Sequence, residues 1–380
     1  MKCNTFHNIV LVNQSSGHLV ADIANAALNH FDKVVVMAHG CNTAERPLDK
    51  RVKIDKLVKY NKQSALKRIL SWTIATMQIL WKLAFKYRNY HVLYFSNPPT
   101  SYFCSLFLKN KYSIMVYDLY PNALATIGIK KDSFIYRRWS EINRKLFAKA
   151  QVIYTLSEGM RQQMKDYCSL DIVRPIPLWS GFEQMKPVPK SENPFVEEHG
   201  LRDKFVVLYS GNIGYTHSVE VLVDVAKQMQ TEQDVVFLII GDGKKKAEIV
   251  HEVNELKLQN VMFLPFQPVD TLPYSLSSAD LGVVTLDENV ANVSVPSKTF
   301  NLMAVGAPIL SISNNETELY RLLSKYGNGR CIPKDSIQEI VDFIMELKQN
   351  KEYASELRMK SLNANSCFTY KNAELLFSKS

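Results

Sequence analysis

A short glycine-containing loop in the second half of the chain is the feature best suited to chemistry. The segment Ser-Gly-Asn-Ile-Gly at 210–214 directly follows the apolar run at 205–209 and precedes a helical pattern. Gly211 and Gly214 allow the backbone to approach a ligand closely, and Asn212 adds a polar side chain between them. The start of the following helix offers unpaired N–H groups and the positive end of its dipole, which suits a phosphate or a diphosphate. A tight strand-to-helix turn without a ligand is the alternative, because the spacing matches neither G-x-G-x-x-G nor a Walker A loop.

A second glycine turn ends the next apolar run. Gly241, Asp242 and Gly243 follow the apolar residues at 235–240. Taken alone, this turn could contact a ligand or simply connect a strand to a helix. It lies at the carboxyl end of a strand, where ligands bind in open parallel sheets.

The segment 293–308 places a lysine at the expected start of a short helix. Pro296 is typical of a first helical position, and Gly306 is typical of a helix end. The unpaired N–H groups of this helix start, together with Ser297 and the ammonium group of Lys298, could hold an anion. A solvated surface lysine is the alternative for Lys298.

The first half has its own candidates. Ser16, Gly17 and His18 follow the first apolar run and form another glycine turn before a helical pattern. His18 could contact a substrate or act as a general base, or it could cap the helix. Asp118 follows the apolar run at 112–117, at the end of a strand where α/β folds gather catalytic and binding groups. Turn formation or capping is the alternative for Asp118.

Several kinds of chemistry are not supported by the sequence. The remaining histidines show neither H-x-E nor H-E-x-x-H spacing, and the six cysteines are scattered without a C-x-x-C pair, so we expect no metal site and no disulfide framework. The absence of a G-x-S-x-G elbow disfavours a serine hydrolase. The cysteine usage and the short apolar run near the N-terminus indicate a protein that stays in the cytoplasm.

Short apolar runs that alternate with helical patterns must position these residues. Runs rich in Val, Ile and Leu are typical of a parallel sheet covered by helices on both faces. The expected strands are 8–13, 33–37, 91–95, 112–117 and 152–155, and then 205–209, 235–240, 261–264, 281–286 and 308–312. Three prolines within 186–194 predict a linker between the two sets. We therefore expect an α/β protein with two doubly wound, Rossmann-like domains whose parallel sheets face a cleft that binds the ligands.

Charge is distributed unevenly between the two halves. Residues 1–186 carry 27 Lys and Arg against 12 Asp and Glu, whereas residues 187–380 carry 19 against 25. Such a split indicates that the first half meets an anionic partner. A helical pattern at 66–87 combines basic, aromatic and aliphatic residues, and its apolar part is too short to span a bilayer. We interpret it as a helix that lies on an anionic membrane surface, with a core helix as the alternative. No nucleic-acid-binding motif is present.

The second half resembles the retaining nucleotide-sugar glycosyltransferases of family 4, which have the GT-B fold, and is most similar to members that build capsule and O-antigen. The matching motifs are Tyr-Ser-Gly-Asn-Ile-Gly (209–214), Gly-Asp-Gly (241–243), Leu-Pro-Phe (264–266), Ser-Ser-Ala-Asp-Leu-Gly-Val-Val (277–284) and Val-Pro-Ser-Lys-Thr-Phe-Asn-Leu-Met-Ala-Val-Gly-Ala-Pro-Ile-Leu (295–310). The resemblance covers about 205–312. The first half matches only loosely, through Asp-Leu-Tyr-Pro at 118–121 and the turn at Gly17.

The resemblance implies roles for individual positions. The implied nucleotide-sugar-binding residues are Gly211, Asn212, Gly214, Gly241, Asp242, Gly243, Phe266, Ser297, Lys298 and Asn301. Family members commonly have two glutamates eight residues apart around the last motif. Here those positions are Val293 and Asn301, so both carboxylates are absent, and Asn301 can hydrogen-bond only without charge.

The function that we expect is transfer of a sugar from a nucleoside diphosphate sugar to a lipid-linked saccharide during surface polysaccharide assembly, with retention of configuration. Lys298 and backbone N–H groups would stabilise the leaving diphosphate, while His18 and Asp118 would place the acceptor hydroxyl. The acceptor-binding candidates are Ser16, Gly17, His18 and Asp118. No metal or other cofactor is expected. A catalytically inactive partner subunit and a sugar-nucleotide epimerase of the same fold are the alternatives.

The expected domain plan follows from the linker and the charge split. We expect a basic, membrane-facing, acceptor-binding domain at 1–186 and a nucleotide-sugar-binding domain at 195–365. The segment 366–380 resembles the C-terminal helix of the family, which would pack back on the first domain. Together these features place the expected protein at the inner face of the cell membrane, as a peripheral cytoplasmic enzyme.

Overall fold

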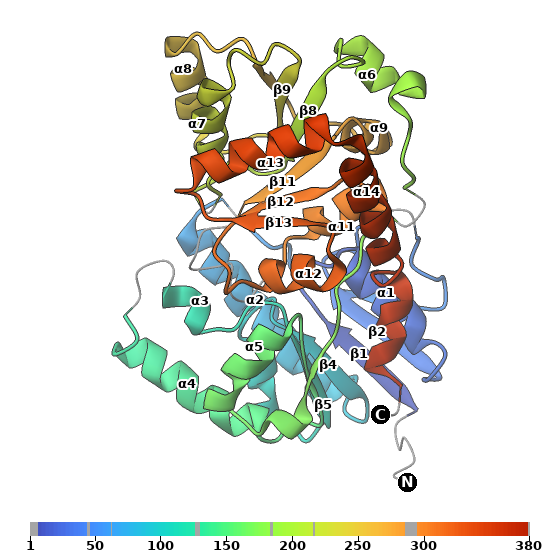
Figure 1. Ribbon diagram of the computed structural model, residues 1–380. Helices are drawn as coiled ribbons and strands as arrows, with labels where there is room; N and C mark the ends of the chain where they lie inside the picture. Colours follow the sequence, from blue (N-terminus) through green and yellow to red (C-terminus); the bar gives the residue numbers. More distant parts are fainter. Residues whose placement is uncertain are drawn as a thin grey trace. The chain divides into compact units, whose positions relative to one another are not determined.

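The chain folds into two compact α/β units (Figure 1). The computed structural model describes residues 7–43, 46–61, 63–125, 130–182, 185–215, 217–285 and 295–378. One unit comprises residues 1–181 and 370–380, and the other comprises residues 182–369. Each unit has a parallel sheet and its own buried core, so the expected fold class of two Rossmann-like α/β domains is confirmed.

The first unit is built on a seven-stranded parallel sheet. Its strands are β1 (Asn8–Val12), β2 (Lys33–Ala38), β3 (Lys53–Lys56), β4 (His91–Phe95), β5 (Tyr112–Val116), β6 (Ile153–Thr155) and β7 (Val173–Pro175). They lie in the order β3-β2-β1-β4-β5-β6-β7. The strand order reverses between β1 and β4. In doubly wound sheets, ligands bind beyond the carboxyl ends of the strands at this point, so we expect the ligand of this unit there.

Helices connect these strands. They are α1 (His18–Ala27), α2 (Ala65–Phe85), α3 (Asn122–Ala125), α4 (Phe134–Phe147) and α5 (Glu158–Gln163), with short 3-10 helices η1 (Ser101–Leu106), η2 (Met164–Asp166) and η3 (Leu170–Ile172). Helix α2 begins where the Ser64 side chain accepts a hydrogen bond from the Lys67 backbone N–H at 3.2 Å. It continues for 21 residues without Gly or Pro.

The second unit repeats this winding with six parallel strands. They are β8 (Phe205–Ser210), β9 (Val235–Ile240), β10 (Val261–Leu264), β11 (Leu281–Thr285), β12 (Ile309–Ile312) and β13 (Gly329–Ile332). Their order is β10-β9-β8-β11-β12-β13, the same relative order as the first six strands of the other unit. The chain reverses its winding direction between β8 and β11, and this is where doubly wound sheets bind ligands.

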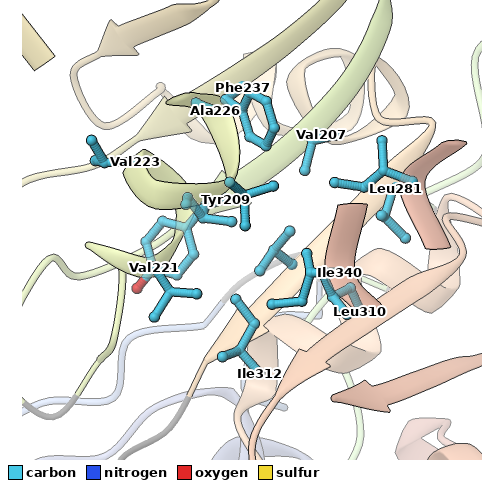
Figure 2. Packing of buried hydrophobic residues seen from close by; sticks show 14 of the residues in the cluster. Val207, Tyr209, Val221, Val223, Ala226, Phe237, Leu281, Leu310, Ile312 and Ile340 are labelled. Carbon is cyan, nitrogen blue, oxygen red and sulfur yellow. The ribbon is translucent and has the colours of Figure 1, made fainter. Parts of the chain in front are cut away.

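The helices of the second unit bury an aliphatic core against this sheet. They are α6 (Pro194–Glu198), α7 (Val221–Gln228), α8 (Lys246–Glu255), α9 (Leu272–Ser277), α11 (Ser297–Ala304), α12 (Glu318–Tyr326), α13 (Ile337–Gln349) and α14 (Lys351–Asn365), with η4 (Lys190–Glu192) and η5 (Val269–Thr271). Figure 2 shows this core, in which Tyr209 of β8 lies among aliphatic side chains such as Val221 and Leu310. Burial of these groups anchors the strand end that leads into the first glycine loop.

The C-terminal segment returns to the first unit. Helix α14 ends at Asn365, and residues 370–376 form the 3-10 helix η6 (Tyr370–Leu376) rather than the continuous helix expected at 366–380. The Leu376 carbonyl accepts a hydrogen bond from the buried Tyr154 hydroxyl at 2.5 Å. The Phe377 ring packs edge-on against Phe31, with 5.7 Å between the ring centroids. These contacts fix the end of the chain on the first unit.

Candidate functional site

The two glycine loops of the second unit lie in direct backbone contact. The β8–β9 register pairs Ser210 with Ile240, so the residues that follow both strands meet at the same edge. The Gly211 N–H donates to the Ile240 carbonyl at 2.9 Å, and the Ile213 N–H donates to the Asp242 carbonyl at 2.8 Å. A side chain would not fit between these loops, because a Cβ atom on Gly241 would lie 1.9 Å from the Gly211 carbonyl oxygen. Glycine is thus required for this close approach.

Lys298 reaches this pair of loops from helix α11. A Cβ atom on Gly211 would lie 2.8 Å from the Lys298 Nζ, so the ammonium group is next to the loop backbone. Nζ also lies 4.1 Å from the centroid of the Tyr209 ring, within range of a cation–π interaction. The ammonium nitrogen is buried and has no hydrogen-bond partner among the described residues. Burial lowers the pKa of Lys298 to about 8. A buried cation without a partner is costly, which indicates that this position is kept for an anionic ligand.

Three more basic side chains surround the loops. The Lys245 ammonium pairs with the Glu220 carboxylate and lies 3.5 Å from the His217 carbonyl oxygen. The Lys246 ammonium donates to the Gly241 carbonyl at 3.1 Å. Burial lowers the pKa of His217 to about 4, and the charges of Lys298 and Lys245 add to this effect. The site therefore holds several positive charges beside backbone N–H groups.

These three basic residues were not predicted to be part of the site. The signal was the run of lysines at 244–246 directly after Gly243. In the structure this run lies at the start of α8, beside the loop that follows β8. We had expected Lys298 and backbone N–H groups to stabilise a diphosphate, and Lys245 and Lys246 add positive charge beside them.

Three other predicted donor-site residues are exposed to solvent. Asn212 is exposed, and its carbonyl accepts a hydrogen bond from the buried Tyr209 hydroxyl at 2.7 Å. Ser297 and Phe266 are also exposed. Helix α11 begins at Ser297, and Pro296 is its N-cap rather than its first helical residue.

Three remaining donor-site predictions concern the loops and the missing glutamates. The Asp242 side chain accepts a hydrogen bond from the Gly243 N–H at 2.8 Å, so it shapes its own loop. Asn301 is half-buried on α11. A Cβ atom on Gly214 would lie 2.5 Å from the side-chain nitrogen of Asn212, so Gly214 leaves room for that side chain. Val293 lies outside the described residues.

In the first unit, His18 is the first residue of helix α1. Its Nε2 lies 3.4 Å from the Trp179 carbonyl oxygen, and burial lowers its pKa. Nearby, the buried Asp22 carboxylate accepts hydrogen bonds from Arg46 at 2.7 Å and from the Trp179 indole at 2.8 Å. The imidazole is therefore neutral near pH 7 and stands beside a satisfied ion pair.

Ser16 and Gly17 shape the turn that leads to His18. Ser16 is buried, and its hydroxyl donates to the Asn13 carbonyl at 3.1 Å. Gly17 is the N-cap of α1, where its extended backbone starts the helix without a side-chain cap. A Cβ atom on Gly17 would have only one neighbour, at 3.9 Å, so this position does not depend on a close approach.

Asp118 follows strand β5 at the carboxyl edge of the same sheet. Its backbone N–H donates to the Ser96 hydroxyl at 3.0 Å. The carboxyl group is in contact with solvent, but the protein atoms around it desolvate it enough to raise its pKa. No contact joins Asp118 to His18 in the described part of the chain, so the structure places the two acceptor candidates at separate points of this edge. Strand β4 lies between the strands that carry them.

The described residues contain neither a candidate metal site nor a candidate membrane-spanning helix. Within the described ranges, no group of three or more His, Cys, Asp or Glu side chains could hold a metal ion. No helix in the described part of the chain combines the length and the apolar character needed to cross a membrane.

Comparisons with known proteins support the fold. Residues 191–363 match the family model "Glycosyl transferases group 1". The two glycine loops and Lys298 all lie within this match. The crystal structure of the Anabaena protein HepE in complex with UDP and glucose aligns over 98% of both chains with a TM-score of 0.70 and 14% sequence identity. The protein therefore has the GT-B fold.

Two relatives are more similar in sequence. WbjE of Pseudomonas aeruginosa, named as a glycosyltransferase, is 27% identical over 62% of this chain and 60% of its own length. WcaI of Escherichia coli (strain K12), named as a colanic acid biosynthesis glycosyl transferase, is 30% identical over 42% of this chain and 40% of its own length. The matches thus span less than two thirds of either relative.

Proposed function

We propose that this protein is a glycosyltransferase that moves a sugar from a nucleoside diphosphate sugar to an acceptor. The observation that carries the proposal is the buried, unpartnered ammonium group of Lys298 beside the two glycine loops, at the carboxyl edge of the second sheet. A diphosphate placed there would pair with the ammonium group and accept hydrogen bonds from backbone N–H groups. Lys245 and Lys246 add positive charge beside the same loops.

The proposed reaction does not need a covalent bond between the sugar and the protein. The bond between the sugar anomeric carbon and the diphosphate oxygen breaks, and a bond from that carbon to the acceptor oxygen forms. Lys298 would stabilise the negative charge that develops on the leaving diphosphate. His18 and Asp118 are the candidates for placing the acceptor hydroxyl. The family resemblance favours retention of configuration, without an essential metal.

We propose a lipid-linked saccharide as the acceptor, in the assembly of a surface polysaccharide such as capsule or O-antigen. The name of WcaI connects that relative to colanic acid biosynthesis, which supports this assignment. A lipid-linked acceptor requires the protein to work at a membrane surface. The first unit has an exposed apolar helix face and a basic surround, which are typical of proteins that bind a membrane surface.

Helix α2 presents an apolar face to solvent. Its inward face buries Ala75, Ile79 and Leu83 in the first unit. Its outward face exposes seven large apolar side chains, among which Met77 is 63% exposed and Phe85 is 76% exposed. The full set is Leu66, Ile69, Leu70, Ile74, Met77, Trp81 and Phe85. An exposed apolar helix face of this extent marks an interaction surface.

The charge around α2 favours an anionic membrane as the partner of this face. Residues 56–117 contain ten Lys and Arg and no Asp or Glu. The 3-10 helix η1 packs against α2 and leads to the exposed Phe107, followed by the exposed Lys109 and Lys111. Apolar insertion combined with a basic surround is typical of proteins that lie on anionic leaflets. We therefore place the protein at the inner face of the cell membrane.

A nucleotide panel followed by an activity assay tests the proposed reaction. UDP, GDP and their sugar conjugates are added to the purified protein, and the melting temperature is followed, because a bound ligand raises it. Donor hydrolysis and transfer to a lipid diphosphate-linked monosaccharide are then measured with the nucleotide that gives the largest shift. We expect both binding and transfer. Binding without hydrolysis or transfer would indicate a catalytically inactive partner subunit, and absence of all binding would contradict the proposal.

Vesicle flotation tests the membrane assignment separately. The protein is mixed with vesicles of equal parts phosphatidylglycerol and phosphatidylethanolamine, or with phosphatidylcholine alone, at low and high salt. We expect flotation with the anionic vesicles that weakens at high salt. Met77→Asp should reduce it, whereas Met359→Asp, on a 55% exposed methionine of α14, should not. Equal flotation of both variants would contradict the role of α2.

A further inference from the structure

An aromatic cluster lies at the carboxyl edge of the first sheet. The Tyr60 and Trp72 rings stack with an interplanar angle of 10° and 6.1 Å between centroids. The Trp72 ring meets Tyr120 edge-on at 6.3 Å. Tyr120 in turn stacks on Trp139 at 5.8 Å. All four residues are half-buried, so part of this aromatic surface is open to solvent.

Two hydrogen-bond donors in this cluster have no acceptor. The indole Nε1 of Trp72 and the Nε of Arg68 are buried and unpartnered within the described ranges. The Arg68 guanidinium lies over the Trp72 ring, 5.5 Å from its centroid, so both donors belong to one place. Native proteins seldom leave two neighbouring donors unsatisfied, because each costs free energy that water or a partner would restore. The unsatisfied pair points to a ligand that brings oxygen acceptors.

A carboxylate completes the cluster. Burial raises the pKa of Tyr120 to about 12, and the negative charge of Asp118 contributes to this increase, so the phenol stays protonated near neutral pH. The Tyr60 side chain also raises the pKa of Tyr120, whereas the positive charge of Arg68 lowers it. The cluster therefore offers a hydrogen-bond acceptor in Asp118 and donors in Tyr120, Trp72 and Arg68.

The cluster lies beyond the carboxyl ends of the central strands. Gln14, two residues after β1, donates from its side-chain nitrogen to the Ser71 carbonyl at 3.1 Å. This bond ties the turn of α2 that carries Trp72 to the end of β1. Asp118 and Tyr120 follow β5, two strands away. The cluster thus occupies the edge at which doubly wound sheets bind ligands.

We propose that Arg68, Trp72, Asp118 and Tyr120 form the subsite that binds the saccharide of the acceptor. This inference rests on the proposed glycosyl transfer and names residues that bind its second substrate. A sugar ring has apolar C–H faces that pack on aromatic rings and hydroxyl groups that both donate and accept hydrogen bonds. The partly exposed aromatic rings can pack against the C–H faces of the sugar. The Trp72 and Arg68 N–H groups can donate hydrogen bonds to sugar hydroxyl oxygens, and the Asp118 carboxylate can accept one from a sugar hydroxyl.

Other occupants fit this chemistry less well. A lipid tail would leave the two buried N–H groups unsatisfied. A free diphosphate offers only hydrogen-bond acceptors, so it could pair with Arg68 but would leave the Asp118 carboxylate without a donor. The outward face of the same helix, including the exposed Leu70, suits the lipid of a lipid-linked saccharide. Helix α2 would therefore contact the lipid on one face and the sugar on the other.

The test separates acceptor binding from donor binding. Transfer to a farnesyl diphosphate-linked monosaccharide in detergent is measured for wild type, Trp72→Phe and Arg68→Ala, with N-acetylglucosamine, glucose and galactose as the sugars. Trp72→Phe keeps a ring but removes the indole N–H, so it isolates one hydrogen bond. We expect the KM for the acceptor to rise about threefold to tenfold in Trp72→Phe and more in Arg68→Ala, while the KM for the donor stays the same.

A control variant and melting temperatures distinguish loss of acceptor binding from misfolding. Arg202→Ala removes an exposed arginine of the second unit that pairs with Glu197, and it should leave both KM values unchanged. Melting temperatures check that each variant is folded. Wild-type acceptor KM values in folded Trp72→Phe and Arg68→Ala would overturn the subsite while leaving the proposed reaction intact. Loss of transfer by wild type with all three sugars would instead remove the proposed reaction, and the subsite with it.

Discussion

The two sheets of this protein wind in the same order, but their carboxyl edges are built differently. In the second unit the edge consists of backbone: Gly211 and Gly241 bring two loops into contact, and one lysine reaches them from a helix. In the first unit the edge consists of side chains, with aromatic rings and a carboxylate contributed by separate elements. A site built from backbone needs particular residues at fixed spacing, whereas a site built from side chains can use many sequences.

Under the proposed function, this difference matches the two substrates that the edges would bind. A diphosphate is common to every nucleotide sugar, so one backbone arrangement with a cation can serve it. Acceptors differ from one polysaccharide to the next, and specificity for hydroxyl groups depends on individually placed side chains. The variants below test whether one edge binds the nucleotide and the other binds the acceptor.

Gly241→Ala should give the largest effect, because it disrupts the loop contact itself. Its Cβ atom would lie 1.9 Å from a backbone oxygen that cannot move without shifting the first loop. We expect the free energy of unfolding to fall by about 3 kcal/mol and nucleotide binding to be lost. Chemical denaturation and calorimetry measure the two effects. Gly40→Ala, at a position with no atom within 4 Å of its Cβ, is the control, and an equal effect there would refute the loop argument.

Lys298→Ala should weaken nucleoside diphosphate binding by roughly 30- to 150-fold, the value of a charge-assisted bond of about 2 to 3 kcal/mol. The free energy of unfolding should stay the same or rise, because the ammonium group is buried without a partner. Lys325→Ala is the matched control, since Lys325 is an exposed lysine 5.1 Å from the Tyr326 ring centroid. Lower stability with unchanged affinity would show that Lys298 is structural.

Asp118→Asn tests the other edge and should have an effect of about 10- to 100-fold on the transfer rate. The amide keeps the shape of the carboxyl group but accepts a hydroxyl hydrogen bond without charge. The melting-temperature increase caused by the nucleotide should match that of wild type, because the proposed donor site lies in the second unit. A variant that loses nucleotide binding would show that the two edges are not separate in function.

The pH dependence of nucleotide affinity gives the smallest effect. Burial lowers the pKa of Lys298 to about 8, so its ammonium group is protonated below that pH and loses its charge above it. Affinity should therefore fall about tenfold from pH 7 to pH 9, over a range in which the terminal phosphate is already ionised. Lys298→Arg keeps its charge and should give a flat profile. A flat profile in wild type would contradict the assignment.

The sequence predicted the central strands better than the outer ones. Strands such as β8 and β9 are buried on both faces and read as uninterrupted apolar runs. Strands β3, β7 and β13 were not predicted, because each pairs on one side only and contains charged residues. Lys53 and Asp55 in β3 illustrate the point: an edge strand is partly solvated and does not need an apolar pattern.

The sequence also predicted one of the two sites better than the other. Gly211, Gly241 and Lys298 were predicted to share a site, and the structure brings them together. The aromatic cluster was not predicted, because Tyr60, Trp72 and Tyr120 lie far apart in sequence and each fits an ordinary apolar pattern. Only the fold brings them to one edge, so spacing along the chain carried no signal for them.

The most direct test of the central claim is a crystal structure with the nucleoside diphosphate that raises the melting temperature most. The account predicts that the diphosphate lies against the loops of Gly211 and Gly241 and accepts a hydrogen bond from the Lys298 ammonium group. A nucleotide bound elsewhere, with this ammonium group still unpartnered, would contradict it.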